Sequence, residues 1–112
     1  MEAPVATPFE TAVARFNASD ARRVVARLTR TLGRPFVSVG ACAGAPNTFR
    51  ITIAWELSWY QWGVDTGEEP RPVFQMDKGG EISELDTAAR QWNAGFGEDG
   101  MVRLVGEPVA GR

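Results

Sequence analysis

The chain of 112 residues has no histidine and a single cysteine, Cys42. Histidine is the commonest general base and the main ligand for transition metals, so its absence removes the usual partner of a nucleophilic serine or cysteine. One cysteine excludes an internal disulfide framework and is typical of a reducing compartment. The sequence therefore points away from an enzyme, and we expect neither a cofactor nor a metal site.

Long hydrophobic runs are also absent. No window approaches the ~18 apolar residues that a membrane-spanning helix needs, and residues 1–9 lack the basic region and apolar run of a signal peptide. We therefore expect a cytoplasmic protein with no membrane partner. Eleven arginines against one lysine, with abundant alanine, glycine and valine, indicate a GC-rich bacterial genome.

Charge is distributed unevenly along the chain. The net charge is −2, yet residues 1–55 sum to +4 and residues 56–112 to −6. Such asymmetry marks either a polar interaction surface or two halves that complement each other within one fold, and we favour the second. The length and the hydrophobic fraction of 44% predict one domain over residues 1–112, with flexible ends at 1–6 and 106–112.

A strict alternation of apolar residues dominates the middle of the chain. The alternating positions are Phe49, Ile51, Ile53, Trp55, Leu57 and Trp59. This pattern predicts a strand with one buried face. After Trp59 the phase shifts to Tyr60, Trp62 and Val64, which suggests a bulge or a bend. We interpret residues 49–64 as one long central strand. Tyr60, Trp62 and Val64 would then lie on the face opposite the main apolar stripe.

Two helices are predicted before this strand. Thr7 and Glu10 form a capping-box pattern around Pro8, which favours a helix start there. A second helix over residues 20–32 ends at Gly33, and one continuous kinked helix is the alternative. The apolar face of the second helix comprises Ala21, Val24, Val25, Leu28 and Leu32.

Shorter elements complete the predicted fold. We expect strands over residues 36–41, 71–76 and 101–105, and a third helix that begins near Ser83 or Asp86 and ends at Asn93. The order ααβββαβ predicts an α+β fold, in which an antiparallel sheet of three or four strands has one long central strand and helices packed on one face.

The aromatic residues of the central strand are the main candidates for a binding surface. Trp55 and Trp59 suit the core, whereas Tyr60 and Trp62 would be exposed if helices cover only the other face. Glu56 lies mid-strand, so its carboxylate is either desolvated and able to act as an acid or base, or exposed and paired with Arg50 or Arg71. The candidate partner- or ligand-binding residues are Tyr60, Trp62, Val64, Trp59 and Glu56.

A basic ridge is predicted on the second helix. Arg23, Arg27 and Arg30 lie within roughly 60° of one another around the helix axis. The simplest interpretation is a solvated helix face, and the functional one is a site for phosphate or for the carboxylates of a protein partner. A pI near 5.1 disfavours nucleic acid. The GxGxxG pattern of residues 95–100 follows a predicted helix and precedes a strand, which is the wrong order for a dinucleotide site.

These observations favour a non-enzymatic protein-interaction module of the adaptor, inhibitor or immunity type. We expect it to self-associate as a homodimer through the aromatic sheet face, or to bind another protein there. The alternative is a small-ligand binding protein or enzyme with a cup between sheet and helices, lined by Trp55, Trp59 and Trp92.

Overall fold

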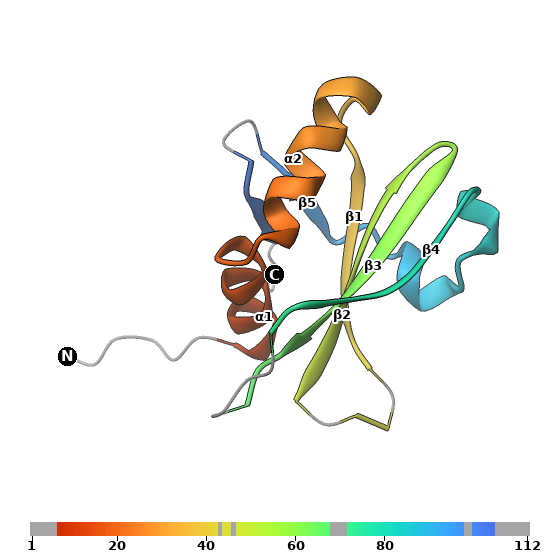
Figure 1. Ribbon diagram of the computed structural model, residues 1–112. Helices are drawn as coiled ribbons and strands as arrows, with labels where there is room; N and C mark the ends of the chain where they lie inside the picture. Colours follow the sequence, from red (N-terminus) through yellow and green to blue (C-terminus); the bar gives the residue numbers. More distant parts are fainter. Residues whose placement is uncertain (1–6, 43, 46, 68–71, 98–99, 105–112) are drawn as a thin grey trace, which may run out of the picture.

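The computed structural model of the chain describes residues 7–42, 44–45, 47–67, 72–97 and 100–104 (Figure 1). Two α-helices come first, followed by four strands, two short 3-10 helices and two further strands. The elements are α1 (Pro8–Asn17), α2 (Ala21–Leu32), β1 (Phe36–Ala41), β2 (Thr48–Trp55), β3 (Ser58–Asp65), β4 (Phe74–Gly79), η1 (Ile82–Glu84), η2 (Thr87–Arg90), β5 (Ala94–Phe96) and β6 (Val102–Leu104).

The two N-terminal helices form as predicted. The capping box is confirmed, because the Glu10 backbone N–H donates to Thr7 Oγ1 at 3.1 Å and the Thr7 N–H donates to Glu10 Oε1 at 2.9 Å. Residues 18–20 lie outside both helices, so α1 and α2 are two separate helices and not one kinked helix. Gly33 ends α2 with φ +91°, a left-handed conformation that favours glycine.

All six strands belong to one antiparallel sheet in the order β4-β3-β2-β1-β5-β6. The predicted α+β class with an antiparallel sheet is confirmed, whereas the predicted three or four strands were too few. Figure 1 shows α1 and α2 on one side of the sheet and the 3-10 segment on the other. We call these the helix side and the outer side. β5 pairs with β1 at Val37, in a stretch predicted as a helix end and a loop.

The prediction of a single long strand over residues 49–64 was wrong. It is a hairpin, in which β2 and β3 pair antiparallel around the two-residue turn Glu56–Leu57. Ile51 lies opposite Trp62, so each odd-numbered residue of β2 faces an even-numbered residue of β3. Because directly opposed residues in an antiparallel pair share a face, the shift of apolar phase comes from chain reversal and not from a bulge.

The prediction of a third helix was also wrong. Its residues form η1 and η2, two short 3-10 turns separated by the extended residues Leu85 and Asp86. Asp86 caps η2 by accepting a hydrogen bond from the Ala89 backbone N–H at 2.9 Å. Leu85 and Ala89 are buried, which accounts for the helix-like apolar spacing in the sequence.

The two sides of the sheet bury different cores. The helix-side core joins Phe16 of α1 and Val25 of α2 to Ile51 and Trp62 of the hairpin. The rings of Phe16 and Trp62 meet edge-on, with centroids 5.6 Å apart. On the outer side a smaller cluster comprises Ala54, Trp59, Leu85 and Ala89.

Close packing on the outer side predicts that a methyl group at Gly79 destabilises the folded chain. A Cβ built there would lie 2.4 Å from Trp59 Cζ2 and 2.6 Å from Glu84 Oε1, whereas a Cβ at Gly80 meets nothing within 4 Å. We expect Gly79→Ala to lower the free energy of unfolding by about 1–3 kcal/mol, measured by urea denaturation. Gly80→Ala is the matched control, and equal effects of the two substitutions would contradict the packing described.

Candidate interaction site

The residues predicted to form an exposed outer sheet face lie on the helix side instead. Tyr60, Trp62 and Val64 stand opposite Ile53, Ile51 and Phe49 respectively, and share their face. Trp62 is only 4% exposed and Val64 is fully buried. The predicted placement of these three residues was wrong, because the change in the apolar alternation reflects the turn between β2 and β3. Of the three residues, only Tyr60 remains half-buried.

Tyr60 lies in an aromatic group beside the end of α2. Its ring stacks on Trp62, with centroids 5.7 Å apart and planes 21° apart, and meets Trp55 edge-on at 6.4 Å. The Trp55 indole Nε1 donates a hydrogen bond to the Gly33 carbonyl oxygen at 2.7 Å. This bond ties the C-terminal end of α2 to the hairpin that carries Tyr60.

Helix α2 is only partly covered by the core of its own chain. Val25 is fully buried, but Val24 and Leu32 keep 38% and 46% of their surface exposed, and Leu28 is half-buried. Residues spaced by four form one stripe along a helix. The apolar stripe of α2 therefore runs from the core out to solvent.

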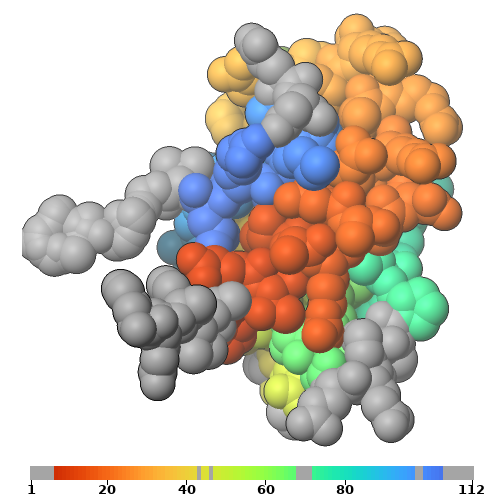
Figure 2. Space-filling view, turned by 90° about the vertical axis from the view of Figure 1, so that its left-hand side faces the viewer, coloured from red at the N-terminus to blue at the C-terminus, as the bar shows by residue number. Residues whose placement is uncertain are grey.

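The exposed stripe lies on the side of α2 nearer the hairpin. Thr29 and Ala26, on the other flank of the helix, line cavities with Phe96 and Gly97. Because β5 lies on one side of β1 and β2 on the other, Val24 projects toward β2 and β3. Figure 2 shows α2 (orange) between the β5–β6 segment (blue) and the green-to-teal strands.

We define the α2 shelf as Val24, Leu28 and Leu32 of α2 together with Tyr60 of β3. Leu28 and Tyr60 both pack against the helix-side core. Two exposed cations border the shelf: Arg27 of α2 and Lys78 of β4. Lys78 stands opposite Tyr60 in the β3–β4 register and therefore shares its face. Neither side chain forms an ion pair within the described part of the chain.

The predicted arginine ridge is divided between two surroundings. Arg27 lies about 60° from Val24 around the helix axis and borders the α2 shelf, whereas Arg23 lies about 140° from Leu28, on the opposite side of the helix. Arg30 instead lines a cavity of about 330 Å³ with Arg22 and Phe96. The Arg22 side chain is held there by the Asn17 carbonyl oxygen, which accepts from its Nε at 3.0 Å.

Glu56 occupies the hairpin turn and not the middle of a strand. It is exposed, and no described residue pairs with its carboxylate. Arg50, one of its two predicted partners, instead contacts Asp86, with Nη2 and Oδ1 3.2 Å apart. Arg71, the other, lies outside the described residues, as do the predicted flexible ends. The prediction that Glu56 lies mid-strand was wrong.

Trp59 lies on the outer side, where it helps to hold the 3-10 segment. Its Nε1 donates to Glu84 Oε1 at 3.1 Å. The same carboxylate accepts the backbone N–H groups of Glu81 at 3.3 Å and Gly80 at 3.1 Å. These three donors, first the two backbone groups and then the indole, lower the pKa of Glu84. Trp59 is thus a structural residue of the outer-side cluster.

The three tryptophans predicted to line one cup are divided between the two sides of the sheet. Trp55 belongs to the helix-side core, whereas Trp59 and Trp92 pack in the outer-side cluster. The cup as predicted is therefore not formed. Small-ligand binding elsewhere stays a prediction.

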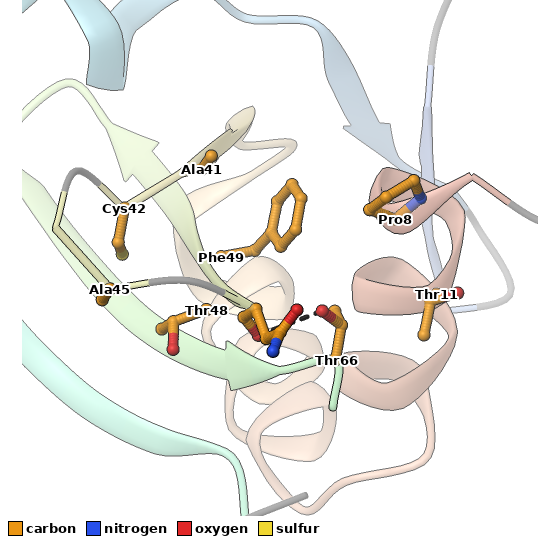
Figure 3. Close-up of a pocket in the computed structure, with 9 residues that line it drawn as sticks. Pro8, Thr11, Ala41, Cys42, Ala45, Thr48, Phe49 and Thr66 are labelled. Atoms are coloured by element: carbon orange, nitrogen blue, oxygen red, sulfur yellow. Dashed lines mark hydrogen bonds between the residues drawn. The ribbon is translucent and has the colours of Figure 1, made fainter. Parts of the chain in front are cut away.

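A separate cavity of about 400 Å³ opens between the start of α1 and the loop that follows β1 (Figure 3). Its lining is uncharged: Pro8, Thr11, Ala41, Cys42, Ala45, Asn47, Thr48, Phe49 and Thr66. Thr66 Oγ1 is already engaged, because it donates to the Asn47 carbonyl oxygen at 3.0 Å. Cys42 has no activating base among these residues.

Two kinds of feature are absent from the described residues. No group of three cysteine or acidic side chains lies close enough together to hold a metal ion, and no helix is long and apolar enough to cross a membrane. Comparison with known proteins gives no match to a protein family, a curated protein or a solved structure.

The lowered pKa of Glu84 predicts a pH dependence of stability. A carboxyl group whose pKa is lowered on folding contributes stability above its ordinary pKa of 4.5, and this contribution is lost as the pH falls below that value. We expect the wild type to lose more stability than Glu84→Gln between about pH 6 and about pH 3, measured from urea midpoints. Glu56→Gln is the control and should lose as much as the wild type. Equal losses in all three proteins would contradict the role of Glu84.

Proposed function

We propose that the chain is a non-enzymatic protein-interaction module that docks a partner protein on the α2 shelf. The observation that carries this proposal is the apolar stripe of α2, which continues from the buried Val25 to the exposed Val24 and Leu32. Single exposed apolar residues are ordinary. Here they share one helix face beside the half-buried Tyr60, which is the arrangement that partner segments recognise as successive anchors.

The rigidity of the shelf supports the proposal. Trp55 bonds to the Gly33 carbonyl oxygen and thereby holds the end of α2. Tyr60 is held between the rings of Trp55 and Trp62. A surface that is ordered before binding loses less conformational entropy when a partner arrives. The proposed docking surface is thus formed by elements that the core already holds in place.

The chemistry of the described residues gives less support to an enzyme. Strongly perturbed acids and bases in a cleft mark catalytic sites. Glu84 is a described acid with a lowered pKa, and the cause is its hydrogen bonds to two backbone N–H groups and the Trp59 indole. That carboxylate is occupied by structural hydrogen bonds on the outer side, away from the α2 shelf.

The proposed surface differs from the one expected from the sequence. Trp62 and Val64 are buried, so a partner could touch them only after the helix side had opened. Tyr60 is the part of the expected aromatic surface that the α2 shelf retains. The expected adaptor, inhibitor or immunity role applies equally to this surface.

Site-specific photo-crosslinking tests this proposal. We expect a photoreactive phenylalanine derivative in place of Val24 to form defined adducts with a protein of the source cell, because this position lies on the α2 shelf. The same derivative in place of Leu57, which is 76% exposed at the hairpin turn, is the control and should not form them. Leu32→Gln should reduce the adducts from position 24 by about tenfold. Identical adducts from positions 24 and 57, or none from position 24, would overturn the proposal.

A further inference from the structure

We infer that the partner of the α2 shelf is a segment of another protein in which carboxylates flank apolar side chains. This inference rests on the proposed function and names the chemistry of its partner. It follows from two cations that border the shelf: Arg27 of α2, and Lys78 of β4, which stands opposite Tyr60.

Neither cation is paired with a carboxylate of the described chain. Both side chains are exposed, and neither forms a hydrogen bond or ion pair with another described residue. Four of the six described carboxylates of the second half of the chain lie on the outer side: Glu81, Glu84 and Asp86 in the 3-10 segment, and Asp77 opposite Gln61. The cations are therefore available to an incoming partner.

The combination of charge and apolar surface favours a peptide segment over nucleic acid. Val24, Leu28 and Leu32 form an apolar stripe along the surface, where a phosphate backbone would find no counter-charge. The chain as a whole carries −2 and would repel a polyanion. Arginine binds carboxylates with two parallel hydrogen bonds, so Arg27 suits Asp or Glu beside an apolar anchor.

The same charges disfavour a second copy of the chain as the partner. In a symmetric dimer each surface patch meets its own copy. Such a contact through the α2 shelf would gather two copies each of Arg27 and Lys78 around one interface, and these outnumber the two copies of Asp20, which lies one turn before Val24. Like charges across an interface oppose association, so we assign the shelf to a different, acidic partner.

A random peptide library displayed on phage provides the probe. Peptides are first selected for binding to the immobilised full chain. Those that also bind the Leu32→Gln variant are then discarded, so that the remaining peptides depend on the α2 shelf. We expect these peptides to be enriched in Asp and Glu beside apolar residues. Their affinity should fall by about tenfold when NaCl is raised from about 50 to about 300 mM, because salt screens exposed charges.

Charge reversal on α2 sharpens the test. Arg27→Glu should weaken a selected peptide by about tenfold, and replacing one of the peptide's acids by lysine should restore its binding to this variant. Arg30→Glu is the matched control, because it changes the net charge equally on the same helix but at a residue that lines the cavity with Phe96. It should change the affinity by less than about threefold. Both arginines are exposed, so neither variant should unfold the chain.

The outcomes separate this inference from the proposed function. Shelf-dependent peptides without acidic enrichment, or an affinity that Arg27→Glu leaves unchanged, would overturn the inference while the docking role stands. A native mass spectrum with a dimer that Leu32→Gln abolishes would also overturn it, and so would binding of DNA or RNA that Arg27→Glu removes. The absence of any shelf-dependent peptide, together with the absence of crosslinks from position 24, would overturn the proposed function itself.

Discussion

The antiparallel pairing of β2 with β3 is the constraint on which the rest of the structure depends. The turn at Glu56–Leu57 sets the register that brings Ile51 opposite Trp62. The aligned apolar side chains of the two strands make one continuous surface, on which Phe16 of α1 packs. A register shifted by one residue would turn one strand's apolar set to the other side of the sheet, and the helices would lose the surface they cover.

The outer side depends on the same pairing but is closed by different means. Short 3-10 turns bury far less apolar surface than α-helices, so the outer-side cluster is small. Trp59 is its largest buried side chain, and the absence of a side chain at Gly79 lets the indole pack closely against β4. Hydrogen bonds to Glu84 then hold the 3-10 segment in place. Polar contacts here supplement a core that is limited in area.

Helix α2 contributes to both the core and the surface. Val25 belongs to the helix-side core, whereas Val24 and Leu32 on the same apolar face extend into solvent. The Trp55–Gly33 hydrogen bond fixes how far the helix covers the hairpin. This partial coverage is what creates an apolar shelf bordered by cations, and it explains how a chain with a net negative charge can present a basic surface to a partner.

The sequence by itself determined the local elements: the capping box at Thr7, the stop at Gly33, and the strand nature of residues 36–41 and 49–55. Such signals depend on the hydrogen bonding and backbone preferences of a few neighbouring residues. Glu56–Leu57 contains none of the residues that usually mark a turn, so chain reversal could not be told from a bulge. Only the tertiary structure decided on which side Tyr60 lies, how much of Val24 and Leu32 is covered, and that Lys78 lies opposite Tyr60 at the shelf. Those properties arise from pairing between distant segments, which local patterns do not encode.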